Sequence, residues 1–234
     1  MNEIIDVAEA YNNGSIRFMG LDFLVAPGAL VPRPETELLG TGAVDELLKL
    51  AYLTPKVVDM CCGTGNLACA LAVNVPSATV WASDLTQECV DIARRNVDHH
   101  GLSSRVSVLQ GNLFQAFAGL GLSGNVDLIV CNPPYISETR LNGNRSDLLK
   151  LEPREAFAAG PYGLDIHMRV AAAAPDYLRT GGILMFEVGL GQERQVKTLL
   201  QRSGAYEHIG VITDDAGQGR VVTARFKGLR LADP

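Results

Sequence analysis

The chain has no run of apolar residues close to the roughly 20 that a membrane-spanning helix needs. Its first nine residues lack the basic and apolar regions of a secretory signal peptide. The five cysteines form no C-x-x-C pair and have no histidines at zinc-ligand spacing: Cys61, Cys62, Cys69, Cys89 and Cys131. These absences predict a cytoplasmic protein with reduced cysteines, no membrane partner and no metal site.

An excess of basic charge is also absent. The 234 residues carry a formal net charge of -6 and a pI of about 5.2. A domain that follows a phosphate backbone normally has a basic face and a high pI, so a long nucleic acid is not an expected partner. The composition, 47% hydrophobic and 20% charged, is that of a folded globular chain. The length fits one α/β domain with a small appendage.

The first part of the chain predicts this appendage. Residues Ile4 to Asn12 can form a short helix, and the alternation from Ser15 to Val25 predicts a β-hairpin. Three prolines within residues 27–37 predict an extended, stiffened loop. We therefore divide the chain into an N-terminal appendage with its proline-rich loop, residues 1–35, and a main domain, residues 36–234.

Strands and helices alternate in the main domain. Helices are predicted over about residues 36–50, 66–73, 87–99, 164–178 and 192–203, and strands over 57–60, 79–83, 106–110, 126–131, 183–188, 207–213 and 220–226. The alternation predicts parallel βαβ units, that is, an α/β doubly wound sheet. The last two strands have no helix between them, which predicts an antiparallel hairpin at one edge.

A glycine-rich turn follows the first strand of the main domain. In this turn, Gly63 and Gly65 remove side chains that would block a bound nucleotide. Asp84, followed by Leu85, ends the next strand about 20 residues later, where a carboxylate can accept hydrogen bonds from both ribose hydroxyls. A tight turn and a helix cap would use the same residues. The spacing from Gly63 to Ala68 also fits the dinucleotide fingerprint, so NAD is one candidate cofactor.

Two further residues can contact the same ligand. Asn112 and Leu113 follow the third strand of the main domain, where they can lie against an adenine ring. A helix start explains them equally well. The cofactor site therefore needs support from another part of the sequence.

The fourth strand runs directly into Asn132-Pro133-Pro134-Tyr135. Two adjacent prolines fit neither a central strand nor a helix interior, so they predict a rigid turn at the carboxyl end of the sheet. An amide or aromatic amino nitrogen is a poor nucleophile because its lone pair is delocalised. The side-chain oxygen of Asn132 and the carbonyl of Pro133 can each accept one of its N–H groups. Tyr135 can stack on the planar acceptor, which aims the lone pair at an electrophilic methyl group.

This turn favours methyl transfer to a planar nitrogen, because hydride transfer does not require such a set of contacts to the acceptor. A strand followed by a proline turn with a capping asparagine is the structural alternative, but it does not account for the glycine turn and Asp84 found in the same chain. The residues therefore predict direct in-line transfer from S-adenosylmethionine to a planar nitrogen. The reaction requires no metal and no covalent intermediate.

These motifs resemble those of the glutamine-N5 methyltransferases that modify peptide chain release factors (the HemK/PrmC type). The resemblance covers nearly all of residues 18–226. Its motifs are Val31-Pro32-Arg33-Pro34-Glu35-Thr36-Glu37, Asn132 to Ile136, Glu152-Pro153-Arg154-Glu155-Ala156-Phe157, Gly163-Leu164-Asp165, Gly181 to Gly189 with Gln192, and Asp214 to Val221. It implies a class I S-adenosylmethionine-dependent methyltransferase fold, a Rossmann-like seven-stranded sheet whose last strand is antiparallel.

The resemblance also implies roles for individual residues. Cofactor contacts are implied at Asp59-Met60-Cys61-Cys62-Gly63, at Asp84 and at Leu113. Recognition of a glutamine amide is implied at Asn132 to Tyr135. Asn132 thus stands at both sites, and the implied partner is a glutamine-bearing release factor.

Two features depart from the family pattern. Cys61-Cys62 stands where the family usually has Gly-Thr or similar residues, so Gly63 must provide most of the local freedom. The family's helical N-terminal domain, which holds the release factor, has no counterpart ahead of the predicted hairpin. An N-methyltransferase of a small metabolite is therefore the alternative function. A cofactor-binding regulatory or interaction protein without turnover is the second alternative.

Charged residues elsewhere are weaker candidates. Arg33 and the two residues after Pro34 can border the substrate entrance or belong to a solvated connection. Glu187 ends the fifth strand and can face the pocket. The polar stretch after Tyr135 can shape an acceptor pocket or be mobile surface, and its charged residues include Arg140, Arg145 and Lys150.

Overall fold

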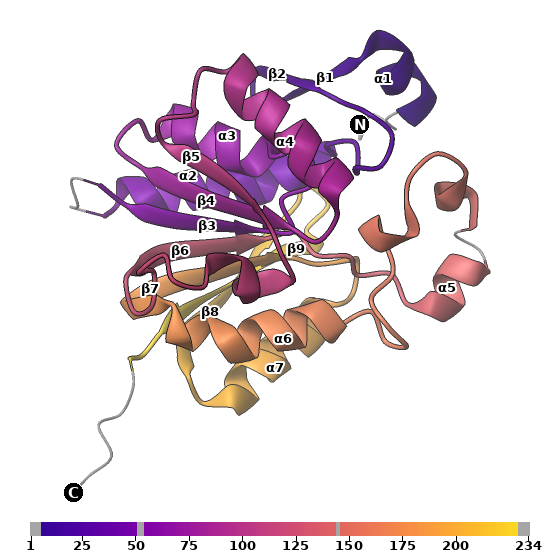
Figure 1. Ribbon diagram of the computed structural model, residues 1–234. Helices are drawn as coiled ribbons and strands as arrows, with labels where there is room; N and C mark the ends of the chain where they lie inside the picture. The colour runs from indigo at the N-terminus through magenta and orange to yellow at the C-terminus, as the bar shows by residue number, and fades with distance from the viewer. Residues whose placement is uncertain (1–5, 51–53, 144–145, 229–234) are drawn as a thin grey trace, which may run out of the picture.

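The computed structural model describes residues 6–50, 54–143 and 146–228, and its centre is a seven-stranded sheet of order β5-β4-β3-β6-β7-β9-β8. Helices cover both faces of this sheet (Figure 1). The strands are β3 Lys56–Met60, β4 Thr79–Asp84, β5 Val106–Gln110, β6 Val126–Cys131, β7 Leu178–Glu187, β8 Tyr206–Thr213 and β9 Gly219–Phe226. Each strand predicted in the main domain is present.

The pairing of the strands confirms the predicted topology. The strands β5, β4, β3, β6 and β7 pair in parallel. Strand β9 lies between β7 and β8 and is antiparallel to both, so the last strand is the reversed one. The strand order changes direction at β3, which pairs with both β4 and β6. In doubly wound sheets, ligands bind at such a switch point, beyond the carboxyl ends of the strands.

Two hydrophobic cores lie on opposite faces of the sheet. Val57 belongs to one core and Val58 to the other, and Leu128 and Ile129 divide in the same way. Successive side chains of a strand point to opposite faces, so near-continuous apolar runs are what a sheet covered on both sides requires. The first core packs against α2 Glu37–Leu48, α3 Asn66–Asn74 and α4 Gln87–His99, and the second against α6 Asp165–Ala173 and α7 Glu193–Ser203.

The N-terminal elements agree with the prediction. Helix α1 covers Val7–Asn13, and the antiparallel strands β1 Ser15–Phe18 and β2 Leu21–Leu24 form the hairpin. The predicted helix start at Ile4 lies outside the described residues. Phe18 and Phe23 are buried in the same core as α2 and α3. The division of the chain at residue 35 therefore stays a prediction.

Two predicted segments differ from the structure. The helix predicted over residues 164–178 ends at Ala173, and a short 3-10 turn over Ala174–Asp176 follows. Pro175 has no N–H and cannot continue a helix interior, so the chain leaves the helix there. Strand β7 consequently begins at Leu178, five residues before its predicted start at Ile183.

The polar stretch after Tyr135 also contains more structure than predicted. It holds α5 Glu138–Asn142 and two 3-10 turns, Ser146–Lys150 and Arg154–Ala156. Ser137 caps α5 by accepting a hydrogen bond from Arg140 N at 3.4 Å. Such short helices have no apolar period that a pattern can detect. Among the described helices, none has the length and apolar character to cross a membrane.

Candidate active site

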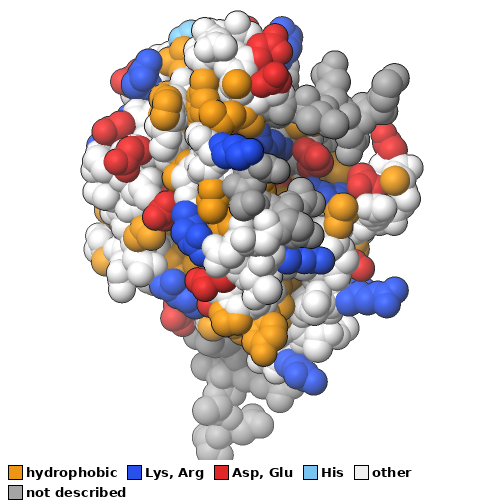
Figure 2. Space-filling view, turned by 90° about the vertical axis from the view of Figure 1, so that its right-hand side faces the viewer, with side chains coloured by type: hydrophobic (Ala, Val, Ile, Leu, Met, Phe, Trp, Pro, Cys, Tyr) orange, Lys and Arg blue, Asp and Glu red, His pale blue; other side chains and the backbone are white. Residues whose placement is uncertain are grey.

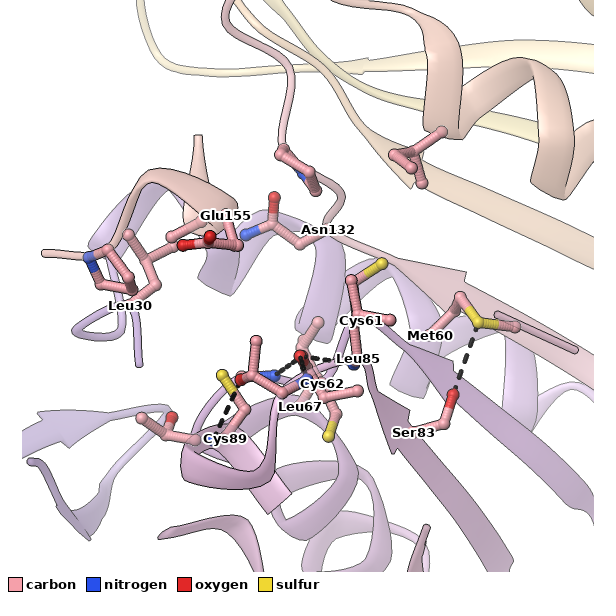
Figure 3. A pocket seen from close by; sticks show the side chains of 18 of the residues that line it. Leu30, Met60, Cys61, Cys62, Leu67, Ser83, Leu85, Cys89, Asn132 and Glu155 are labelled. Carbon is pink, nitrogen blue, oxygen red and sulfur yellow. Dashed lines mark hydrogen bonds between the residues drawn. The ribbon is translucent and has the colours of Figure 1, made fainter. Parts of the chain in front are cut away.

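A first pocket opens at the switch point of the sheet (Figure 3). Figure 3 shows Asn132 and Glu155 on one side of it, and Cys62, Leu67 and Cys89 on the other. Figure 2 faces this edge of the molecule, where charged side chains lie beside hydrophobic ones. Of the residues predicted to bind the cofactor, the lining includes Met60, Cys61, Cys62, Gly63, Asp84, Leu85, Asn112, Leu113 and Asn132.

The turn after β3 presents its backbone to this pocket. Gly63 has a φ of +53°, and a Cβ at this position would meet no atom within 4 Å. Cys61 also has a positive φ, of +59°, which is uncommon for a residue with a side chain. The carboxylate of Asp84 holds the turn, because its Oδ2 accepts a hydrogen bond of 2.9 Å from Gly63 N.

Two predicted cofactor residues lie behind the turn and do not line the pocket. Asp59 is fully buried, and its Oδ2 accepts a hydrogen bond of 2.9 Å from Ala68 N at the start of α3. Burial raises the pKa of Asp59 to about 8. Gly65 has a φ of +74°, and a Cβ there would lie 3.0 Å from the Cβ of Ala93. Both residues hold the turn against the neighbouring helices.

The residues after β5 form another wall. Asn112 and Leu113 line the first pocket together with Gly111, and Leu113 has a φ of +54°. Oδ1 of Asn112 accepts a hydrogen bond of 2.7 Å from Nη2 of Arg169. The sequence pattern did not indicate Arg169, which reaches the wall from α6.

A second pocket lies on the other side of the Asn-Pro-Pro-Tyr turn. Its lining includes Pro133 and Tyr135 from the turn, and also Glu187 and Arg220. Pro134 lines the first pocket only. The two pockets share four residues, Leu30, Arg33, Asn132 and Ala156. The turn therefore separates two hollows, and Asn132 faces both.

The side chain of Asn132 has a defined partner. Its Nδ2 donates a hydrogen bond of 3.1 Å to Oγ1 of Thr36, which is 2% exposed. One N–H of the Asn132 amide is thereby used, which fixes the amide so that its Oδ1 can accept a hydrogen bond from a ligand. The sequence predicted that Thr36 borders the substrate entrance or belongs to a solvated connection, and no pattern indicated this contact.

Three charged side chains of the second pocket have buried polar atoms without partners. These atoms are Nη1 of Arg33, Oε2 of Glu187 and Nε of Arg220. Burial raises the pKa of Glu187 to about 7, although Thr36, Arg220 and Tyr135 act in the opposite direction. Buried polar atoms are normally hydrogen-bonded, so unpaired ones beside a pocket indicate a ligand site.

An ion pair ties the proline-rich loop to the region after α5. Glu152, which is 4% exposed, binds the guanidinium of Arg33 through Oε2, and its Oε1 accepts a hydrogen bond of 2.9 Å from Val31 N. Of the charged residues predicted after Tyr135, Arg140 lines the second pocket and Arg145 lies outside the described residues.

The reversed strand β9, the glycine turn after β3 and the Asn-Pro-Pro-Tyr turn after β6 together define a class I S-adenosylmethionine-dependent methyltransferase. Residues 39–148 match the family model of the methyltransferase small domain. A methyltransferase from Pyrococcus furiosus has a similar fold, with a TM-score of 0.60, 19% identity and 90% of each chain covered. The catalytic domain of hMettl16 is also similar, with a TM-score of 0.67 and 15% identity over 92% of this chain and 79% of that chain.

The chain belongs to the family of the release factor glutamine methyltransferases. It is 37% identical to the release factor glutamine methyltransferase of Moorella thermoacetica over 214 residues. The aligned region covers 92% of this chain and 73% of that protein. The corresponding protein of Geobacter sulfurreducens is 37% identical over 216 residues, 92% of this chain and 72% of the relative. The predicted resemblance and the prediction of an S-adenosylmethionine-dependent N-methyltransferase are confirmed.

Proposed function

We propose that the protein methylates the side-chain nitrogen of a glutamine in a peptide chain release factor. S-adenosylmethionine would occupy the first pocket, and the glutamine amide the second. The observation that carries the proposal is that Asn132 lines both pockets. Two reactants on either side of one residue are positioned for direct in-line transfer.

The first pocket fits the cofactor in the chemistry of its walls. Asp84 accepts hydrogen bonds from Leu85 N and Thr86 N through Oδ1 and from Gly63 N through Oδ2, so one lone pair of Oδ2 stays free. We assign this lone pair to the ribose hydroxyls. The backbone from Met60 to Gly63 lies along the cofactor, and Asn112 and Leu113 flank the adenine. When bound, S-adenosylmethionine supplies a methyl group on a sulfonium, which is already electrophilic.

The second pocket fits a planar primary amide. We assign one amide N–H to Oδ1 of Asn132 and the other to the carbonyl of Pro133, and we place the ring of Tyr135 against the amide plane. These contacts hold the nitrogen in a position where its lone pair faces the first pocket. Transfer would form the N–C bond as the bond from the methyl carbon to the sulfonium sulfur breaks and leaves a neutral thioether. The amide would keep one N–H and lose its other hydrogen as a proton to water. Arg33, which lines both pockets, borders the acceptor.

The proposal is tested with cofactor labelled in its methyl group. The purified protein is incubated with a release factor and, separately, with a metabolite extract. Label in the release factor supports the proposal. Label found only in small molecules would make the protein a metabolite N-methyltransferase, and label in neither would point to a binding protein without turnover.

A further inference from the structure

A third pocket adjoins the second pocket beside Tyr135. Four residues line both pockets, namely Tyr135, Arg140, Leu190 and Gln192. The other residues of the third pocket are Ser137, Pro161, Tyr162, Gly191 and Gln195. The two pockets therefore form a groove that continues from the proposed acceptor site to the surface of the protein.

Hydrogen bonds of Gln192 hold the base of this groove. Its Nε2 donates to the backbone oxygen of Tyr135 at 3.0 Å and to that of Gly163 at 3.4 Å. Its Oε1 accepts a hydrogen bond of 3.0 Å from Gly189 N. One side chain thus joins the Asn-Pro-Pro-Tyr turn, the turn after β7 and the loop ahead of α6. The groove has this form before a substrate binds, which reduces the cost of ordering it.

The loop that carries Tyr162 is fixed against the chain that follows Tyr135. The backbone oxygen of Gly160 accepts a hydrogen bond of 3.1 Å from Glu138 N. Gly163 has a φ of +74°, and a Cβ there would overlap the backbone oxygen of Tyr135. Because Gly163 has no side chain, the loop can approach the turn closely. Tyr162 consequently stands at the side of the groove.

Two large side chains of the groove are exposed. Tyr162 is 82% exposed and Leu190 is 56% exposed. Covering apolar surface of this kind is favourable by roughly 25 cal/mol per Å². Tyrosine is also one of the residue types that are enriched at protein interfaces and at their energetic centres. The two side chains therefore suit a partner that is large enough to cover both.

Arg140 gives the groove its charge. It is the only charged side chain among the described residues that line the third pocket, and it also lines the second. Its backbone N–H donates to Ser137, whereas its guanidinium has no hydrogen bond or ion pair within the described part of the chain. A guanidinium offers five N–H donors and no acceptor, so it fits carbonyl oxygens of a peptide backbone.

We propose that the third pocket holds the polypeptide segment next to the methylated glutamine. The segment packs against Tyr162 and Leu190, and Arg140 donates to one of its main-chain carbonyl oxygens. The inference rests on the proposed function, because it starts from a glutamine side chain in the second pocket. The residues beside such a glutamine need space beyond that pocket, and the adjoining groove provides it. A free small amide has no such neighbours.

The test measures initial rates of methyl transfer from labelled cofactor to a release factor. Tyr162→Ala and Leu190→Ala should each raise the KM for the release factor by about tenfold. Neither residue lines the first pocket, so kcat and the Kd for the cofactor should change by less than about twofold. Leu48→Ala is the matched control, because Leu48 is 65% exposed at the end of α2 and lines none of the three pockets. Its KM should be that of the wild type.

The melting temperature of each variant checks that it is folded. Wild-type KM values in both groove variants, with label in the release factor, would overturn the inference and leave the proposed function intact. Label in a different glutamine-bearing protein, with the KM for that protein raised in both variants, would support the inference and contradict only the release factor as acceptor. Label in small molecules alone, or in nothing, would overturn both.

Discussion

Oδ2 of Asp84 accepts a hydrogen bond of 2.9 Å from the backbone N–H of Gly63, which joins the end of β4 to the turn after β3. The other oxygen, Oδ1, accepts a hydrogen bond of 2.8 Å from Leu85 N. The carboxylate that we assign to the ribose therefore also fixes the turn that we place along the cofactor.

Asp84→Asn should weaken cofactor binding by about 10- to 100-fold, because a charge-assisted hydrogen bond contributes about 1.5–3 kcal/mol. The new NH2 group can accept neither from Gly63 N nor from a ribose hydroxyl. Calorimetric titration of cofactor into the protein measures the change in Kd. Asp91→Asn, on the exposed side of α4, is the control and should bind normally. An unchanged Kd in Asp84→Asn would refute the assignment.

Gly63→Ala should also weaken cofactor binding, for a steric reason. The glycine has a positive φ and open space where a Cβ would stand, so the methyl group projects into the room that the cofactor needs. Gly14, at the end of α1, has a φ of +70° and similarly open surroundings. Both alanine variants should lose about 1–2 kcal/mol of stability from backbone strain. Only Gly63→Ala should change the Kd, and equal Kd values for the two variants would contradict the placement of the cofactor.

The two contributions of Tyr135 can be separated. Tyr135→Phe removes only the hydrogen bond to Glu187, which at 3.4 Å is long, and should lower kcat by less than about tenfold. Tyr135→Ala also removes the ring that is assigned to stack on the amide, and should lower kcat by about 10²-fold. Steady-state kinetics with the protein acceptor measure both. Equal losses in the two variants would show that stacking is not the main contribution.

Much of this fold followed from local patterns. Successive residues such as Val57 and Val58 face opposite cores, so the strands of the large sheet carry an apolar signal of their own. The location of Gly63, Asp84 and Asn132 was also predictable, because each follows a predicted strand, and all three line the first pocket. The sequence predicted the correct edge of the sheet for all three.

The contacts between these parts were not predictable. Thr36 and Asn132 are 96 positions apart, and Arg33 and Glu152 are 119 apart. Such pairs depend on how the loops pack over the sheet, and one sequence contains no periodic signal for that. For Asp59 and Gly65 the sequence motif was present, but the predicted role differs from the contacts in the structure. Each carries a motif signal for the cofactor, yet each contributes to the site by holding the turn in place.

The ion pair of Arg33 and Glu152 should contribute to stability. Glu152→Ala removes the partner of Arg33 and leaves Val31 N without its acceptor, so the free energy of unfolding should fall by about 3 kcal/mol. Glu152→Gln keeps an acceptor for Val31 N and should lose less. Urea denaturation measures both. Lys49→Ala, which breaks an exposed pair with Glu46, should leave the midpoint unchanged. A wild-type midpoint for Glu152→Ala would contradict this account.

The most direct test of the central claim maps the methyl group on a release factor after reaction with the wild type and with Asn132→Ala. The account predicts one methyl group on the side-chain nitrogen of a glutamine, made by the wild type. Asn132→Ala should still bind S-adenosylmethionine but form this product at least about 10²-fold more slowly. A methyl group on any other atom, or wild-type turnover in Asn132→Ala, would contradict the account.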